Sequence, residues 1–193
     1  TSIFLSSLRL VKEFKKQIFS ATNLSMAGKI YVFTEVNFSE LKGEQPDGLI
    51  IVVSAGKIKD AALLEVKNKN SDLDEGQILR YLDVAKRFKI PKLITISNQF
   101  VSTPTQTPLH IKAPKNVALY HLSWSYIMTL AHILLFENDN NIEDEDQVEV
   151  MREVVKYFDH SVSGVNGFTI MKAGWKNVID KMGSNSSLRK NDP

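Results

Sequence analysis

The sequence contains no cysteine, which excludes disulfide bonds and thiolate metal sites. No apolar run approaches the roughly 18 residues that a membrane-spanning helix needs, and the amphipathic pattern of residues 1–19 is unlike that of a signal peptide. A glycine-rich phosphate loop is absent, and the four histidines lack the spacing of metal ligands. These absences argue against a disulfide-stapled secreted fold, a membrane protein and a nucleotide-hydrolysing enzyme. We therefore expect a cytoplasmic protein with no membrane partner.

Charge is nearly balanced overall but is unevenly distributed along the chain. The net charge is +2 over 193 residues. Residues 85–116 contain six basic residues and no acidic residue, whereas residues 137–153 contain eight acidic residues and one arginine. Each run is compatible with a solvated surface. The basic run is also compatible with a surface that faces phosphate groups.

Hydrophobic periodicity predicts a single domain of the α/β class. The predicted helices cover residues 6–19, 72–89, 123–136, 143–158 and 170–182, and the predicted strands cover residues 29–38, 47–53, 61–67, 92–97 and 116–122. Asp72, with Glu75 three residues later, is the predicted cap of the second helix, and Ser123 is the predicted cap of the third. This order predicts a mixed central sheet flanked by helices over residues 1–183, with a polar, flexible tail at 184–193. Both ends fit boundaries within a longer protein.

The predicted strand 61–67 begins with four apolar residues and ends with two charged ones. Glu65 and Lys67 are two positions apart, so their side chains point to the same face of the strand. The connection to the preceding strand is short, which indicates an antiparallel hairpin. With the turn centred on Gly56, paired residues have numbers that sum to 112, and Asp47 lies opposite Glu65.

Two carboxylates that face each other repel unless a positive charge lies between them. Lys67 supplies one such charge, but it lies one pleat further along the strand. A divalent cation is the other candidate, because Mg²⁺ takes oxygen ligands from one or two carboxylates and from water. The main-chain carbonyl of Val66 would add a further oxygen. The pattern therefore predicts that the end of this strand holds a metal ion and a phosphate group.

Two short motifs resemble the signature of the PD-(D/E)XK nuclease superfamily. The pair Pro46–Asp47 precedes an apolar strand, and the sequence EVK, which begins at Glu65, ends the next strand. The resemblance implies a restriction-endonuclease-like fold. It also implies that Asp47, Glu65 and the Val66 carbonyl bind a metal ion, and that Lys67 positions or activates the attacking water.

A third motif, in the predicted helix that follows, narrows the resemblance. Gln77 and Tyr81 lie at i and i+4 on one helix face, which is similar to the QxxxY element of the RecB-like branch. The resemblance spans residues 6–97 and implies that both side chains orient the site or contact the substrate. It further implies a Mg²⁺-dependent DNA endonuclease or exonuclease of the restriction, repair or recombination type, with Mn²⁺ as a substitute.

The first predicted helix offers a further metal ligand. Members of the family often add a carboxylate from this helix, which here would be Glu13. Glu35 competes for that role. Glu13 is equally compatible with a surface ion pair to Arg9 or Lys16.

Several basic residues are candidates for contacts with DNA phosphates. They are Lys12, Lys15, Lys69, Arg80, Lys86 and Arg87. Two other functions stay open: a nuclease-like domain that binds nucleic acid without cutting, and an interaction module that docks through the acidic helix 143–158. Besides DNA, the partners that fit are further domains or subunits of a larger enzyme and a second copy of the chain.

Overall fold

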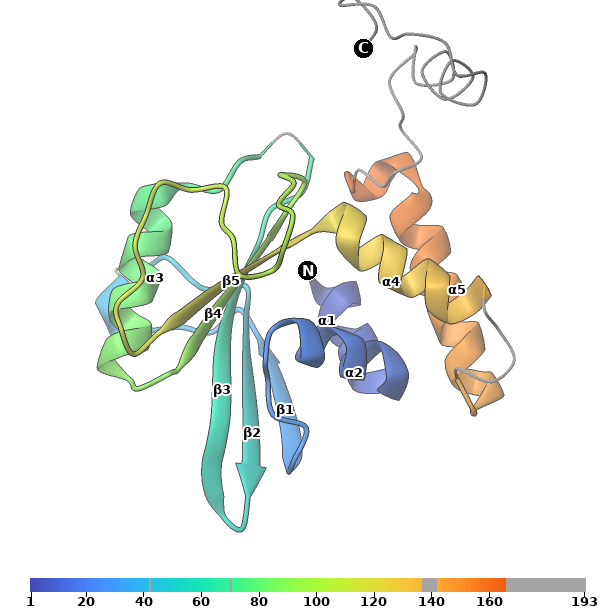
Figure 1. The fold of residues 1–193 in the computed structure, drawn as a ribbon, viewed down its shortest axis with the longest axis horizontal. Coiled ribbons are helices and arrows are strands. Elements are labelled where there is room, and N and C mark those ends of the chain that lie inside the picture. Colours follow the sequence, from blue (N-terminus) through green and yellow to red (C-terminus); the bar gives the residue numbers. More distant parts are fainter. Residues whose placement is uncertain (42, 70, 137–141, 166–193) are drawn as a thin grey trace, which may run out of the picture.

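The computed structural model describes residues 1–165 except 42, 70 and 137–141. These residues form a five-stranded mixed sheet with helices on both faces (Figure 1), which confirms the predicted α/β class. The strands lie in chain order: β1 (Lys29–Thr34), β2 (Gly48–Ser54), β3 (Lys57–Val66), β4 (Lys92–Ser97) and β5 (Ala118–Ser123). The first two pairs are antiparallel, and β3–β4 and β4–β5 are parallel.

The helices form a layer on each side of the sheet (Figure 1). One layer contains α1 (Ser2–Leu10), α2 (Lys12–Ala21), α4 (Trp124–Phe136) and α5 (Glu145–Asp159), and the other contains α3 (Glu75–Arg87). Short 3-10 turns lie at η1 (Ser39–Leu41) and η2 (Ser161–Ser163). In β3, Ala62 and Leu64 pack on the four-helix side, whereas Ala61 and Leu63 pack on the α3 side. β3 begins four residues earlier than predicted, with the exposed residues 57–59. Burial of both faces explains the unbroken apolar run that follows at residues 61–64.

The β2–β3 hairpin has the predicted register at the end that carries the charged residues. Gly48 pairs with Leu64 and Val52 pairs with Asp60, so the numbers of paired residues sum to 112 over this stretch. Nearer the turn, a bulge after Val52 shifts the pairing by one residue. The turn is Ala55–Gly56, whose φ angles of 48° and 74° fit a type I′ hairpin turn.

The N-terminal region forms two helices, so the prediction of a single helix over residues 6–19 is wrong. Val11 lies between them, is extended (φ −109°, ψ 106°) and is fully buried. The rings of Phe4 and Phe14 contact edge to face, with centroids 6.2 Å apart. Ten residues of continuous helix would separate them by about 15 Å along the axis. The break therefore lets both rings enter the same core.

Helix α3 begins later than predicted because Asp74, and not Asp72, is its N-cap. The Asp74 carboxylate accepts a hydrogen bond from the Gln77 N–H at 2.6 Å. Leu73 is buried in the core on the α3 side, and its N–H donates to the side chain of Gln99. These two contacts hold Leu73 outside the helix.

Other boundaries lie within a few residues of the predictions. Strand β4 has the predicted limits, whereas β1 ends at Thr34 because the next residue, Glu35, has a φ of 52°. Ser123 caps α4 as predicted, since its Oγ accepts a hydrogen bond from the Tyr126 N–H at 3.2 Å. The predicted helix 170–182 and the predicted tail lie outside the described residues. Among the helices that the structure describes, none has the length and apolarity needed to cross a membrane.

Candidate functional site

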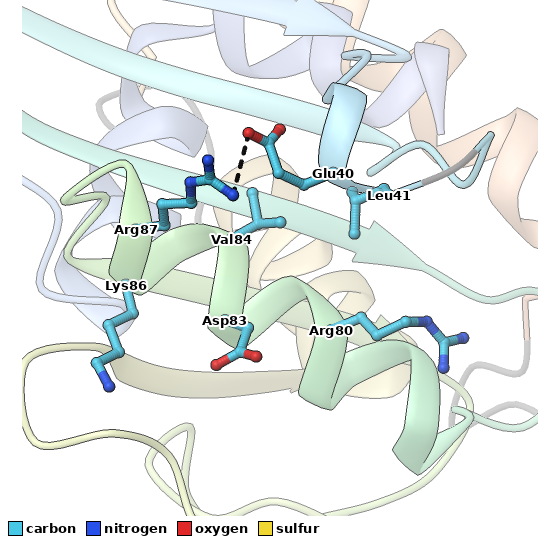
Figure 2. Close-up of a pocket in the computed structure, with 7 residues that line it drawn as sticks. All are labelled: Glu40, Leu41, Arg80, Asp83, Val84, Lys86 and Arg87. Atoms are coloured by element: carbon cyan, nitrogen blue, oxygen red, sulfur yellow. Dashed lines mark ion pairs between the residues drawn. The ribbon is translucent and has the colours of Figure 1, made fainter.

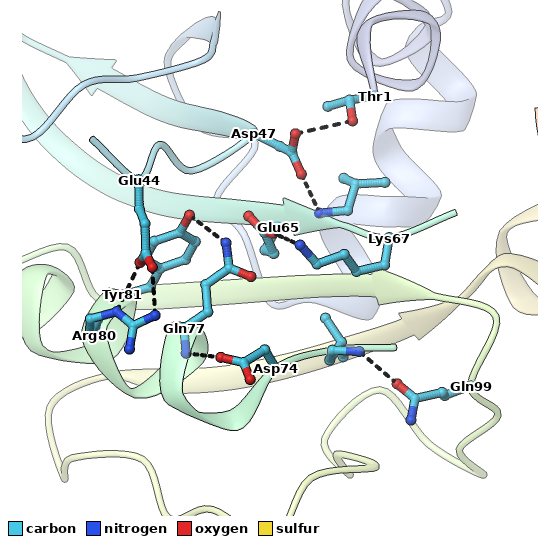
Figure 3. A network of polar contacts seen from close by, with 12 residues as sticks. Thr1, Glu44, Asp47, Glu65, Lys67, Asp74, Gln77, Arg80, Tyr81 and Gln99 are labelled. Carbon is cyan, nitrogen blue, oxygen red and sulfur yellow. Dashed lines mark hydrogen bonds and ion pairs between the residues drawn. The ribbon is translucent and has the colours of Figure 1, made fainter. Parts of the chain in front are cut away.

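The carboxylate of Asp47 lies at the end of the β2–β3 hairpin. Asp47 immediately precedes β2, and its Oδ2 accepts a hydrogen bond from the Val66 N–H at 2.7 Å (Figure 3). Its Oδ1 lies 3.4 Å from the hydroxyl of Thr1, at the start of α1. The side chain of Asp47 thus continues the pattern of hydrogen bonds between the two strands and is fixed beside the end of β3.

Glu65 is a buried carboxylate with one oxygen bound and the other unpaired. Its residue exposure is 2%, and Oε1 lies 2.7 Å from Nζ of Lys67. Oε2 is buried and, within the described residues, has no hydrogen-bond partner. Burial raises the pKa of Glu65, as does the nearby charge of Asp47, while the hydrogen bond from Lys67 lowers it. A buried carboxylate oxygen without a partner is costly, so the donor set fits a hard cation placed between Glu65 and Asp47.

The backbone that follows Glu65 is fixed by hydrogen bonds of the Lys67 N–H and carbonyl. The Lys67 N–H donates to the Ile96 carbonyl of β4 at 2.8 Å, and the Trp124 indole N–H donates to the Lys67 carbonyl at 3.0 Å. The N–H and C=O of one strand residue face the same neighbouring strand. The Val66 carbonyl therefore faces the same edge as its N–H, which is the edge where Asp47 lies.

Gln77 and Tyr81 enter the site from α3, the next element along the chain. The Gln77 side-chain amide donates to the Tyr81 hydroxyl at 3.0 Å (Figure 3). Tyr81 is fully buried. Burial, and next the charge of Glu65, raises the pKa of Tyr81 to about 12. The charge of Asp47 also raises the pKa of Tyr81. The Tyr81 hydroxyl is therefore a neutral group within electrostatic reach of both carboxylates.

Sequence reasoning missed Glu44, which lies at the rim of the same site. Arg80 donates to it through two nitrogens, Nε at 2.9 Å and Nη2 at 2.6 Å. The pKa of Glu44 is lowered chiefly by Arg80 and slightly by Lys67, and Glu44 adds to the rise in the pKa of Tyr81. Arg80, a predicted phosphate contact, is therefore already paired with a carboxylate. Glu44 belongs to no motif, so no sequence signal distinguished it.

The predicted third metal ligand does not join the site. Within the described residues, no three acidic or histidine side chains converge to hold a metal ion, so Glu13 is not gathered with Asp47 and Glu65. The break at Val11 places Glu13 on α2. The helix next to Asp47 is α1, whose N-cap Thr1 contacts Asp47 and which contains no acidic residue.

The predicted phosphate contacts do not form one surface. Lys12 and Lys15 lie on α2, on the opposite side of the sheet from α3. Lys86 and Arg87 lie in the last turn of α3, roughly 14 Å along the helix axis from Gln77. In that turn, Arg87 pairs with Glu40 at 3.4 Å beside a groove of about 470 Å³ (Figure 2).

Lys69 is the predicted contact that lies nearest to Lys67 in the chain, and it is held by a clamp that the sequence did not indicate. Its N–H donates to the Gly164 carbonyl at 2.8 Å, and its own carbonyl accepts from the Asn98 side chain at 2.8 Å. The Asn98 side chain also donates to the Gly164 carbonyl at 2.9 Å. Gly164 has a φ of 70°, and a Cβ added there would lie 2.9 Å from the Lys69 nitrogen. The position therefore requires glycine.

Comparison with known proteins gives no family. No protein-family model matches the sequence, and neither does any curated protein. A function must therefore be argued from the geometry of Asp47, Glu65 and Lys67, and from the two α3 side chains beside them.

Proposed function

We propose that the protein is a Mg²⁺-dependent nuclease that hydrolyses phosphodiester bonds, with a restriction-endonuclease-like fold and DNA as its substrate. The observation that carries the proposal is the buried carboxylate of Glu65, which binds Lys67 through one oxygen and leaves the other unpaired next to Asp47. An ion pair that only stabilised the fold would not need a second carboxylate beside the unpaired oxygen. A cation site does need it. The cytoplasmic location stays a prediction.

Asp47, Glu65 and the Val66 carbonyl are the groups that would hold the metal ion. Mg²⁺ or Mn²⁺ bound there would lower the pKa of a bound water and offset the charge on the scissile phosphate. The chain contributes the rigidity of this site, because Asp47 is tied to the Val66 N–H and Lys67 is tied to β4. A preorganised donor set loses little free energy to reorganisation during the reaction.

Lys67 would act on the attacking water and on the phosphate. Its Nζ is held by Glu65 Oε1, which leaves two further N–H donors on the ammonium. One can hydrogen-bond the water and the other a phosphoryl oxygen as negative charge develops. Tyr81 and Gln77 support this arrangement, since a neutral hydroxyl beside Glu65 adds no charge to the site.

The rival interaction-module function has less support. The apolar face of α5 is buried against the core through Met151, Val154, Val155 and Phe158. Two of its acidic residues form ion pairs within the helix, Glu149 with Arg152 and Glu153 with Lys156. The acidic surface is therefore partly neutralised by its own helix.

The test is cleavage of covalently closed circular DNA and of linear DNA in Mg²⁺, in Mn²⁺ and in EDTA. We expect cleavage with either metal and none in EDTA. Nicking of the circle indicates an endonuclease, and loss of the linear substrate alone indicates an exonuclease. Glu65→Gln and Lys67→Ala should each lower the rate by about 100-fold or more, whereas Lys57→Ala, at the far end of β3, should cleave like the wild type.

Binding of DNA without cleavage under all metal conditions would favour the non-cleaving alternative. Equal cleavage by the wild type and Glu65→Gln would overturn the assignment of the site.

A further inference from the structure

The outer edge of β1 carries hydrogen-bonding groups that no other strand uses. β1 is the first strand of the sheet and pairs only with β2 among the described residues. The Lys67 N–H, just after β3, donates to Ile96 of β4, so the odd-numbered residues of β3 face β4 and the even-numbered ones face β2. Carried through the β2–β3 and β1–β2 registers, this alternation directs the backbone groups of odd-numbered β1 residues toward β2. The N–H and C=O groups of Ile30, Val32 and Thr34 therefore point away from the sheet. In the described part of the chain nothing pairs with them.

This edge lacks the features that usually protect an exposed strand. Such strands are commonly interrupted by proline, bulges or several charges. β1 contains no proline, its pairing with β2 has no register shift, and Lys29 is its only charged residue. Tyr31 and Phe33 are 38% and 46% exposed. Both side chains lie on one face, since they are two positions apart.

We propose that β1 pairs antiparallel with β1 of a second copy of the chain, around a two-fold axis at Val32. Backbone groups that point outward must face each other, so even-numbered residues must lie opposite even-numbered residues. Two symmetric registers meet this condition with five paired residues each, one centred on Tyr31 and one centred on Val32. Both would join the two sheets into one continuous sheet.

Charge selects the register centred on Val32. In this register, the position next to the paired residues brings Lys29 to Glu35 of the partner subunit, the first residue after its β1, and by symmetry the same pair forms again. Both residues are exposed, and neither has an ion-pair partner in the described part of the chain. Centring on Tyr31 would instead place Lys29 opposite the partner's Phe33.

The same register places Tyr31 opposite the partner's Phe33 as a non-hydrogen-bonded pair. Side chains approach most closely in such pairs, and aromatic pairs are favourable across strands. The edge is therefore complementary to itself in hydrogen bonds, aromatic contacts and charge. This combination points to a second copy and not to an unrelated strand. The contact is smaller than a standard interface of about 1,600 Å², so we expect a weak, concentration-dependent dimer.

The first test is sedimentation equilibrium of the full chain over a wide concentration range. The wild type should dimerise reversibly. Thr34→Pro should be monomeric, because it removes an outward N–H without removing a β1–β2 hydrogen bond. Circular dichroism checks that this variant folds. A wild type that is monomeric at every concentration would overturn the proposal.

A charge exchange tests the register and does not depend on the proline variant. Lys29→Glu and Glu35→Lys should each weaken the dimer by about tenfold, since each replaces two attractive pairs with two repulsive ones. The double variant should restore wild-type affinity. Lys57→Glu, at the hairpin turn, is the matched control and should dimerise normally. If dimer affinity is unchanged in Thr34→Pro and in both single charge variants, the dimer uses another interface and the proposal is overturned.

Cross-linking gives a third readout, because the native chain has no cysteine. The Cα atoms of a non-hydrogen-bonded pair lie about 4.5 Å apart, within the range that a disulfide accepts. A mixture of Tyr31→Cys and Phe33→Cys should cross-link faster than either variant alone. Equal rates in all three samples would exclude this register. None of these measurements depends on nuclease activity, so the two proposals can fail separately.

Discussion

The ammonium of Lys67 occupies one oxygen of the Glu65 carboxylate, at 2.7 Å, and leaves the other oxygen buried without a partner in the described residues. The two side chains therefore form a half-satisfied pair in which the carboxylate retains an open coordination position. Lys67 is partly exposed and Glu65 is not. The free-energy cost of removing charge from water therefore comes mainly from Glu65.

Replacing Glu65 with glutamine should change how stability depends on pH. Burial raises the pKa of Glu65 from its ordinary value of 4.5. The folded protein thus holds this proton more tightly than the unfolded chain. The resulting contribution to stability is complete below about pH 4.5 and is lost as pH rises through the folded-state pKa. In EDTA, Glu65→Gln should gain stability over the wild type across this interval, measured by urea unfolding. Parallel pH profiles would contradict the assigned burial, and Mg²⁺ should reverse the order at neutral pH.

Two substitutions at Asp47 should separate its structural role from metal binding. Asp47→Asn keeps an oxygen that can accept from the Val66 N–H, so the metal-free variant should be about as stable as the wild type. Asp47→Ala leaves that N–H unpaired and should cost about 1–3 kcal/mol. Wild-type stability should rise by about 1.4 kcal/mol at a Mg²⁺ concentration ten times Kd, and both variants should lose most of this gain. Thermal unfolding in EDTA and in Mg²⁺ measures all three proteins, and an undiminished Mg²⁺ effect in Asp47→Asn would remove Asp47 from the ligand set.

Alanine at Gly164 should disturb the strand end through Lys69. A positive φ alone costs an alanine roughly 1–2 kcal/mol. At Gly164 the new Cβ would also lie 2.2 Å from Cγ and 2.9 Å from the nitrogen of Lys69. Gly56 is the matched control, because it has a similar φ of 74° and nothing within 4 Å of an added Cβ. Gly164→Ala should therefore lower the free energy of unfolding more than Gly56→Ala. Equal losses of unfolding free energy in urea would show that the contacts between Lys69 and Gly164 rearrange without cost.

Removal of the Tyr81 hydroxyl should lower the free energy of unfolding only at pH values below the raised pKa of Tyr81. Tyr81→Phe loses the hydrogen bond from Gln77 at a cost of about 1 kcal/mol. Because the pKa is raised to about 12, Tyr81 adds stability that is complete below about pH 10 and is lost toward pH 12. Ultraviolet titration should lose one late-ionising tyrosine in the variant. A titration curve unchanged from the wild type would contradict this assignment.

Lys69 is the basic residue that we expect to meet DNA near the site. Lys69→Gln should reduce the slope of log affinity against log salt by roughly 0.9, the value for one phosphate contact on duplex DNA. Lys86→Gln, in the last turn of α3, should leave the slope unchanged. Fluorescence anisotropy in EDTA measures binding without cleavage. If Lys86→Gln reduced the slope and Lys69→Gln did not, the DNA-binding surface would lie on the basic run 85–116.

The sequence predicted features that local chemistry determines. Two β-rich segments with a short connection and a glycine turn imposed the hairpin register, so Asp47 could be placed beside Glu65 before the fold was known. The four apolar residues at 61–64 predicted a strand, which the structure shows to be buried on both faces, and Ser123 was identifiable as a cap.

The features that were missed depend on contacts between distant segments. The break at Val11 follows from the packing of Phe4 on Phe14, and that contact has no local signal. Asp72 and Asp74 are equivalent as caps in sequence, and only the burial of Leu73 distinguishes them. Glu44 and Gly164 reach the site from segments without motifs, so their roles require the tertiary structure.

The end of β3 also offers a way to follow folding. The adjacent amides of Val66 and Lys67 donate in opposite directions, one to the Asp47 side chain across the hairpin and the other to Ile96 across the parallel pair. A chain in which the hairpin has closed but β4 has not docked would protect the first amide from hydrogen exchange and leave the second open. Local contacts form before those across a crossover. The delay between protection of the two amides therefore measures how long the hairpin end exists before β4 completes the proposed cation site.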